Sequence, residues 1–302
     1  MTPIRIATRA SRLALWQAEF VRAALKSQNP DRHVELVEIV STGDQVRDRP
    51  LHEIGGVGLF TKEVQEAVLD RRADLAVHSL KDLPTVSHPD LVLAAVPGRG
   101  PVADVLLAPR WKRFESLPAG ARVATSSLRR RAQLLAKRPD LFLVDIRGNV
   151  ETRIRKLHET GLDGLVLASA GIHRLGLEAE ITHELPTDLM VPAVGQGALG
   201  IECRRDDADT ARALETLDDP VTRQAVSAER AFLHALQGGC QTPIGAYATV
   251  SGGMVNLLGI VLDRDGKESF SATAVGLADQ PAEVGWELAQ RLIERGADRL
   301  VR

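Results

Sequence analysis

The chain has 302 residues, a formal net charge of −2 and an aromatic content of 3%. Since one domain usually takes about 100–200 residues, this length predicts two or three domains. The small net charge and the scarce aromatic side chains argue against a nucleic-acid-binding protein, which would need positive charge and rings that stack on bases.

Two cysteines cannot form a disulfide framework, so we expect a reducing, cytoplasmic compartment, with a single Cys203–Cys240 disulfide left open. Arginines interrupt the apolar residues near the N-terminus, and no run approaches about 18 uncharged apolar residues. We therefore expect neither a signal peptide nor a membrane span.

Strand and helix patterns alternate from residue 4 to residue 96, which is typical of an α/β sheet covered by helices. Ser11 is placed to cap the first helix, whose expected buried face holds Leu13, Trp16, Phe20 and Ala24, with Leu25 as a further candidate. The polar, glycine-rich stretch 41–58 predicts a long loop. The expected strands are 4–7, 34–40, 74–78 and 91–96, and a second helix is expected at 60–71.

A lysine and a carboxylate, Lys81 and Asp82, follow directly after the third expected strand. Open α/β sheets bind ligands at the carboxyl ends of their strands. The two side chains are therefore candidates for an acid/base pair. The alternative is an ordinary charged turn that Pro84 ends.

The breaker cluster 97–101 predicts a domain boundary or hinge, and the alternation restarts beyond it. Two successive α/β units predict two similar domains around a cleft. Cys203, in a strand expected to rejoin the first sheet, is expected to be structural. The expected strands are 123–125, 141–144, 165–168 and 200–203, and the helices are 128–137 and 149–158.

Ten basic and three acidic residues lie between positions 122 and 156, a local balance of 10 − 3 = +7. Thr125, Ser126 and Ser127 lie where a strand ends and a helix begins, with Ser126 or Ser127 as the expected N-cap, so backbone N–H groups and the helix dipole favour an anion there. Arg129 and Arg130 oppose that dipole, which an anionic ligand would explain.

Arg147 occupies the equivalent position after the next strand, and Arg153 follows one helical turn later. Arginine offers a planar fork that matches a carboxylate or a phosphate. A solvated face explains a single arginine equally well, but the set at the strand ends predicts an anion site.

The last part of the chain predicts a smaller α+β domain. Within it, Cys240 lies in the glycine-rich loop 238–245, where a thiol has room to carry a covalently held group. The alternative is a small buried apolar side chain. The expected helices are 221–236 and 281–295, and antiparallel strands are expected at 246–250, 255–262 and 269–275, with a hairpin at 263–266.

The sequence has no His/Cys cluster with metal-ligand spacing, no P-loop and no nucleophile elbow. We therefore expect no metal. A covalent-anchor cysteine, an acid/base candidate and an arginine-lined cleft together suit a polyanionic organic substrate that is extended on an enzyme-held primer.

Seven short motifs, read together, resemble the porphobilinogen deaminase family, also called hydroxymethylbilane synthase. Each motif alone is weak, but all seven occur in register from residue 4 to the last domain. They are Arg5-Ile6-Ala7-Thr8-Arg9, Gly58-Leu59-Phe60, Ala76-Val77-His78-Ser79-Leu80-Lys81-Asp82, Thr125-Ser126-Ser127-Leu128-Arg129-Arg130, Arg147-Gly148-Asn149, Pro192-Ala193-Val194-Gly195-Gln196-Gly197 and Gly239-Cys240-Gln241.

The resemblance implies two α/β domains similar to type II periplasmic binding proteins around a cleft, plus a smaller α+β C-terminal domain. The implied boundaries are 1–98 with 198–217, 102–192 and 219–302. The implied reaction joins four porphobilinogen molecules head to tail, with release of ammonia and then hydroxymethylbilane, in tetrapyrrole biosynthesis. The growing chain starts from a dipyrromethane cofactor held by a thioether at Cys240.

The resemblance also implies roles for individual residues. Asp82 is the implied catalytic carboxylate, which stabilises positive charge as ammonia leaves. Phe60, at the end of the long loop 41–58, is implied to cover the pyrroles as part of a lid. Val57 stands where the family commonly has a lysine, so any role of that lysine in the lid is either unfilled in this chain or taken by another residue. The residues implied to bind cofactor or substrate are Arg9, Ser11, Lys81, Thr125, Ser127, Arg129, Arg130, Arg147, Arg153, Gly171, Arg174 and Gln196.

A transferase of this kind would act on a small molecule, as a monomer, without nucleic acid or membrane as partner. The alternative is a non-catalytic protein of the periplasmic-binding-protein type that binds an organic anion. Release of ammonia from porphobilinogen separates the two hypotheses.

Overall fold

The computed structural model describes residues 3–40, 61–239 and 242–301. The predictions for Val57, Phe60, Cys240 and the loop at 41–58 therefore lie outside the described residues. Contacts divide the chain into two compact units. Their described parts are 3–40, 61–99 and 198–223 for the first unit, and 100–197, 224–239 and 242–301 for the second.

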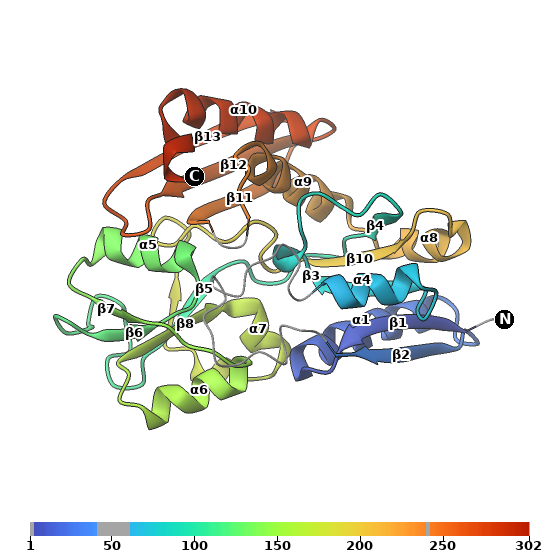
Figure 1. Ribbon diagram of the computed structural model, residues 1–302, viewed down its shortest axis with the longest axis horizontal. Coiled ribbons are helices and arrows are strands. Elements are labelled where there is room, and N and C mark those ends of the chain that lie inside the picture. The colour runs from blue at the N-terminus through green and yellow to red at the C-terminus, as the bar shows by residue number, and fades with distance from the viewer. Residues whose placement is uncertain (1–2, 41–60, 240–241, 302) are drawn as a thin grey trace. The chain divides into compact units, whose positions relative to one another are not determined.

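The first unit contains a five-stranded sheet in the order β2-β1-β3-β10-β4 (Figure 1). β1 pairs in parallel with β2 and β3, while β10 is antiparallel to both β3 and β4. The predicted return of β10 to the first sheet is confirmed. The strands are β1 (Ile4–Arg9), β2 (Val34–Ile39), β3 (Leu75–Ser79), β4 (Leu91–Ala95) and β10 (Leu199–Arg204).

Helices cover both faces of this sheet because neighbouring strand residues point to opposite sides. Ile6 and Leu75 belong to the apolar cluster that contains residues of α1, whereas Ala7 and Ala76 belong to the cluster that contains residues of α4. The helices of this unit are α1 (Arg12–Gln28), α4 (Lys62–Leu69) and α8 (Ala208–Leu214), with short 3-10 turns η1 (Leu80–Asp82) and η3 (Glu215–Leu217).

The expected buried face of α1 is right at Leu25, which is 1% exposed, and wrong at its two aromatic residues. Gln17, Ala18 and Val21 are buried, whereas Trp16 and Phe20 are 38% and 41% exposed. The two aromatic rings, one helical turn apart, stack on each other with their centroids 5.6 Å apart. The two rings therefore shield each other on the more exposed side of the helix.

The second unit repeats the same strand arrangement in the order β7-β6-β8-β5-β9. β6 is parallel to β7 and β8, and β5 is antiparallel to β8 and β9. β5 and β9 were not predicted from the sequence. The strands are β5 (Asp104–Leu107), β6 (Arg122–Ala124), β7 (Phe142–Val144), β8 (Gly164–Ala168) and β9 (His183–Leu185).

Helices again pack on both faces of the second sheet. Leu134 of α5 shares an apolar cluster with Val123, while Ile154 and Leu157 of α6 share another with Ala124. The helical elements are α5 (Leu128–Lys137), α6 (Val150–Glu159), α7 (Ser169–Arg174) and the 3-10 turn η2 (Glu178–Glu180).

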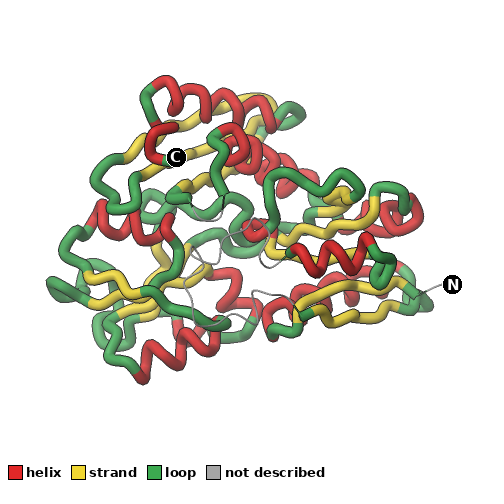
Figure 2. The backbone as a smooth tube through the Cα atoms, viewed as in Figure 1, coloured by secondary structure: helices red, strands yellow, loops and turns green. Residues whose placement is uncertain are grey.

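The last part of the chain forms the predicted antiparallel sheet with packed helices, as the secondary-structure colouring of Figure 2 makes clear. Phe232 and Leu288, from its two helices, are fully buried in one core with Val255 and Leu257. The elements are β11 (Ile244–Ser251), β12 (Met254–Leu262), β13 (Ser269–Leu277), α9 (Pro220–Ala235), α10 (Pro281–Glu294) and the 3-10 turn η4 (Ala297–Leu300).

The two α/β sheets and the smaller α+β part confirm the predicted fold class. The division into three domains at the boundaries given above stays a prediction. In the described residues, no helix combines the length and the apolar character that a membrane span requires.

Candidate functional site

The candidate site in the second unit lies where several strands of one sheet meet a common edge. β6, β7 and β8 are parallel, so their carboxyl ends share that edge. Because β5 runs in the opposite direction, its first residue, Asp104, lies beside Ala168 at the end of β8. Topology therefore brings a carboxylate to the same edge as the predicted arginines.

The start of α5 has the local structure that the sequence predicts. Ser127 caps the helix, and its side-chain oxygen accepts a hydrogen bond from the Arg130 amide at 3.4 Å. The amide of Ser127 donates to the side chain of Thr125 at 3.3 Å. This cap orients the first helical turn, which carries Arg129 and Arg130, toward the edge of the sheet.

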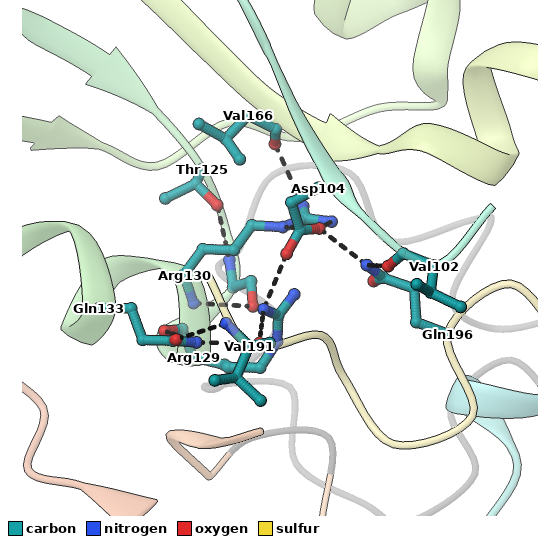
Figure 3. A network of polar contacts seen from close by, with 10 residues as sticks. Val102, Asp104, Thr125, Arg129, Arg130, Gln133, Val166, Val191 and Gln196 are labelled. Atoms are coloured by element: carbon teal, nitrogen blue, oxygen red, sulfur yellow. Dashed lines mark hydrogen bonds and ion pairs between the residues drawn. The ribbon is translucent and has the colours of Figure 1, made fainter. Parts of the chain in front are cut away.

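Asp104 binds both of these arginines (Figure 3). Its Oδ1 accepts hydrogen bonds from Nε and Nη2 of Arg130 at 2.9 and 2.7 Å, and its Oδ2 lies 2.8 Å from Nη1 of Arg129. Asp104 is 0% exposed, and the two arginines are 4% and 6% exposed. The chain itself therefore supplies one anion to the two arginines that the sequence predicts to bind a ligand.

Asp104, Arg129 and Arg130 form a buried cluster whose charges affect the pKa values of Asp104 and Arg129. Burial opposes the charge on Asp104, but Arg129 and Arg130 outweigh this effect and hold the pKa of the carboxyl well below its ordinary value. Burial lowers the pKa of the Arg129 guanidinium, and the Asp104 carboxylate acts in the opposite direction. Two guanidiniums and one carboxylate leave the cluster with one net positive charge.

Gln196 joins the same cluster from a connecting segment, which we define as residues 191–197. Its Nε2 donates to Oδ1 of Asp104 at 3.0 Å and to the carbonyl of Val102 at 2.8 Å. Arg129 also donates to the carbonyl of Val191 at 2.6 Å. The structure thus brings together Arg129, Arg130 and Gln196, three of the residues predicted to bind cofactor or substrate.

Arg174 holds the end of the connecting segment. Its Nη2 donates to the carbonyl of Gly197 at 2.6 Å, and burial lowers the pKa of its guanidinium to about 10. Arg174 is the last residue of α7, the short helix that directly follows β8 and that also contains the half-buried Gly171. Both predicted residues therefore lie just beyond the strand that pairs with Asp104.

Arg147 lies in the connection from β7 to α6, and Arg153 lies in the first turn of α6. Nε of Arg153 donates to the carbonyl of Gly148 at 2.8 Å, and Lys156 donates to the carbonyl of Arg147 at 3.0 Å. Both arginines are partly exposed. They follow the strand next to β6, as the sequence predicts.

The predicted residues of the first unit also lie at a carboxyl edge of parallel strands. Arg9 ends β1, and Ser11 caps α1 by accepting a hydrogen bond from the Ala14 amide at 3.3 Å. Lys81 and Asp82, both half-buried, form the 3-10 turn that directly follows β3. These four residues, like Thr125 and Ser127, have the positions in the fold that the sequence predicts, while their roles stay predictions.

Comparison with known proteins gives the family. Residues 4–212 match the family model described as "Porphobilinogen deaminase, dipyromethane cofactor binding domain", and residues 223–294 match "Porphobilinogen deaminase, C-terminal domain". The chain belongs to the porphobilinogen deaminase family. The predicted family is confirmed, and with it a transferase and a dipyrromethane cofactor.

Curated relatives in the porphobilinogen deaminase family match almost the whole chain. The porphobilinogen deaminase of Syntrophotalea carbinolica is 49% identical over 99% of this chain and 95% of its own length. That of Brevibacillus brevis is 49% identical over 97% of this chain and 94% of its own length. A periplasmic solute-binding protein from Desulfovibrio salexigens gives a TM-score of 0.43, with 11% identity over 72% of each chain.

The cluster of Asp104, Arg129 and Arg130 fits a cofactor that carries carboxylates. Within the described part of the chain, Nε of Arg129 is a buried donor without a hydrogen-bond partner. A buried donor of this kind is costly unless something accepts its hydrogen bond. A carboxylate would accept it, and the net positive charge of the cluster favours one. The described residues contain no group of three or more potential metal ligands from His, Cys, Asp and Glu.

Proposed function

We propose that this chain condenses four porphobilinogen molecules head to tail, releases ammonia at each addition and finally releases hydroxymethylbilane for tetrapyrrole biosynthesis. The observation that carries the proposal is that two family models together match residues 4–212 and 223–294. The buried, net-positive arginine cluster at a strand edge supports it, because each pyrrole of such a chain carries acidic side arms.

Dipyrromethane, held by a thioether at Cys240, would supply the terminal pyrrole from which the chain grows. Each addition would break the carbon–nitrogen bond in the aminomethyl group of porphobilinogen and a carbon–hydrogen bond at the open position of that pyrrole. The two carbons would form a carbon–carbon bond, and the displaced proton would leave with the nitrogen. The nitrogen leaves as ammonia. The protein then has to hold several carboxylates in place and to stabilise positive charge at the reacting carbon.

The described side chains suit these two tasks. Arg129, Arg130 and Arg174 would bind carboxylates of the cofactor and of the growing chain, with Thr125 and Ser127 beside them. Asp82, at the end of β3, would stabilise the positive charge that develops as ammonia leaves and would exchange protons with the substrate. Further carboxylate contacts are proposed for Arg9, Arg147 and Arg153. Other contacts with the cofactor or substrate are proposed for Ser11, Lys81, Gly171 and Gln196, and Phe60 is proposed as the lid residue.

Intact mass spectrometry combined with an ammonia assay tests the proposal. After incubation with porphobilinogen, the protein should exceed its sequence mass by one dipyrromethane, and the added mass should map to the peptide that contains Cys240. Cys240→Ser should abolish both the added mass and ammonia release. Cys203→Ser is the matched control and should keep both, because Cys203 is fully buried in β10.

Two results would reject the proposal. An unmodified protein that releases ammonia at full rate would remove the covalent primer from the account. Binding of porphobilinogen without ammonia release would favour the alternative, a non-catalytic protein that binds organic anions. We also propose a monomer located in the cytoplasm, with no nucleic acid as partner, which sedimentation and cell fractionation would test.

A further inference from the structure

Asp104 has no role among the residues that the family resemblance implies, yet it contacts three of them. Its Oδ1 accepts hydrogen bonds from Arg130 at 2.9 and 2.7 Å and from Gln196 at 3.0 Å. Its Oδ2 forms an ion pair with Arg129 at 2.8 Å. One carboxylate therefore contacts three side chains that are proposed to bind cofactor or substrate.

The geometry of these contacts is fixed by burial. Asp104 is 0% exposed, so water does not compete for its oxygens, and charged hydrogen bonds are stronger in such surroundings. Each oxygen holds a different guanidinium, and Arg130 is bound through two of its nitrogens. A guanidinium is planar and carries its donors in fixed directions, so fixing one edge fixes the direction of the others.

The cluster is left short of one negative charge. Arg129 and Arg130 carry two positive charges against the single charge of Asp104, and buried charges are normally paired. Within the described residues, Nε of Arg129 has no hydrogen-bond acceptor although the side chain is only 4% exposed. The missing charge and the missing acceptor both correspond to one carboxylate.

We propose that Asp104 is a positioning residue, which aims the guanidiniums of Arg129 and Arg130 and leaves Nε of Arg129 and one positive charge for a single carboxylate of the cofactor or of the growing chain. This inference rests on the proposed function for the identity of its ligand. The carboxylate of Asp104 itself does not react.

The direction in which Asp104→Asn changes the affinity for a carboxylate separates two roles of Asp104: positioning the arginines, or only reducing the positive charge of the cluster. Asp104→Asn removes a negative charge and raises the net charge of the cluster from +1 to +2. If Asp104 only weakened the attraction for anions, the variant would bind a carboxylate more tightly. If Asp104 aims the arginines, the variant binds it more weakly in spite of the added positive charge.

The binding arm uses succinate as the probe and the full chain with Cys240→Ala, because a covalently held cofactor would compete for the same arginines. Dissociation constants come from thermal stabilisation at constant ionic strength, and neutral succinamide controls for effects unrelated to charge. Asp104→Asn should weaken succinate binding about 10- to 100-fold, the equivalent of one charge-assisted hydrogen bond. The activity arm, with Cys240 intact, should show a higher KM for porphobilinogen.

Asp140→Asn is the matched control for the loss of an aspartate that pairs with arginine. Asp140 binds two nitrogens of Arg138, each at 2.7 Å, just beyond the end of α5, but it is exposed. This variant should keep the succinate affinity and the KM of its parent. If it loses both as Asp104→Asn does, the effect is not specific to the cluster and the inference is wrong.

Unchanged or tighter succinate binding by Asp104→Asn would overturn the inference, as would a parent chain that succinate does not stabilise.

If Asp104→Asn does not fold, Asp104→Glu decides, because it keeps the charge and moves the carboxylate by one methylene. Binding weakened about tenfold in a folded Asp104→Glu protein supports positioning, and parental affinity contradicts it. If the Cys240→Ala parent binds succinate but the chain with Cys240 intact releases no ammonia, the proposed function is rejected while the inference is still judged on binding.

Discussion

The carboxylate of Glu229 in α9 accepts a hydrogen bond from the amide of Gly195 in the connecting segment at 2.8 Å. Its other oxygen accepts one from the amide of Ala248 in β11, also at 2.8 Å. Glu229 is 0% exposed. A single buried carboxylate thus ties the segment that contains Gln196 to the α+β part of the second unit.

We expect Glu229→Gln to destabilise the protein by about 1.5–3 kcal/mol, the range for a lost hydrogen bond to a charged group. The amide group of glutamine has one oxygen, so its nitrogen would face a backbone N–H that also donates. Urea denaturation measures the change. Glu294→Gln, at an exposed position near the end of α10, should change the free energy of unfolding by less than about 0.5 kcal/mol. Equal losses in both variants would contradict the role given to Glu229.

Gly266, in the turn between β12 and β13, lies directly against α5. Its φ angle is +69°, and a Cβ at this position would lie 2.1 Å from the carbonyl oxygen of Ala132. We expect Gly266→Ala to cost the penalty of a left-handed conformation, about 1 kcal/mol, plus about 1–3 kcal/mol for the clash with helix backbone.

Gly252 offers the matched control for this prediction. It has a similar φ angle of +57°, but nothing lies within 4 Å of a Cβ added there. Gly252→Ala should therefore show the conformational penalty alone. The difference in free energy of unfolding between the two variants measures the contact of the hairpin with α5. A difference near zero would mean that the hairpin moves away without loss.

Local signals predicted much of the candidate site. Of the two candidate caps, Ser126 and Ser127, the structure uses Ser127, and Arg129 and Arg130 follow it at the strand edge, because capping and strand ends depend on nearby residues. Asp104 was missed because it belongs to β5, which is antiparallel within a sheet of parallel strands and meets its arginine partners across 25 residues or more. The apolar run 105–108 after the breaker cluster was the available signal for that strand.

Packing preferences explain the wrong face of α1. Sequence periodicity placed the large rings of Trp16 and Phe20 inside, because large apolar side chains contribute most to a core. The structure instead buries Ala18 and Val21, and the side-chain Nε2 of Gln17 donates a hydrogen bond to the hydroxyl of Ser79 at 2.8 Å. The distance between a helix and a sheet is a property of the packed fold, so periodicity alone could not choose between the two faces.

Ionisation of the Cys203 thiol should lower the free energy of unfolding at alkaline pH. Burial raises the pKa of its thiol to about 11 from an ordinary value of 9.0, so the folded state holds the thiol proton more tightly than the unfolded chain. This contribution is fully present below pH 9 and is lost as the pH rises toward 11.

The test compares wild type with Cys203→Ala by urea denaturation between pH 8 and pH 11. The wild-type free energy of unfolding should fall more steeply, by up to about 1.4 kcal/mol per pH unit, because the alanine variant lacks the thiol. The small cavity left by alanine lowers stability equally at each pH and does not change the slope. Parallel slopes would mean that the folded thiol titrates as it does in the unfolded chain.

Asp82 gives the most direct prediction about the proposed reaction. It ends the 3-10 turn after β3, and that turn is held to the sheet by a hydrogen bond from the Leu80 amide to the carbonyl of Ala198 at 3.0 Å. We expect Asp82→Asn to fold and to keep the cofactor mass while kcat for ammonia release falls about 100- to 10,000-fold. The amide has nearly the same shape but cannot stabilise positive charge or accept a proton in the same way.

Asp90 is an exposed aspartate of the same unit, so Asp90→Asn serves as the control and should keep the wild-type kcat. A wild-type rate in an Asp82→Asn protein that carries the cofactor would remove Asp82 from the mechanism, since no step would then depend on its charge.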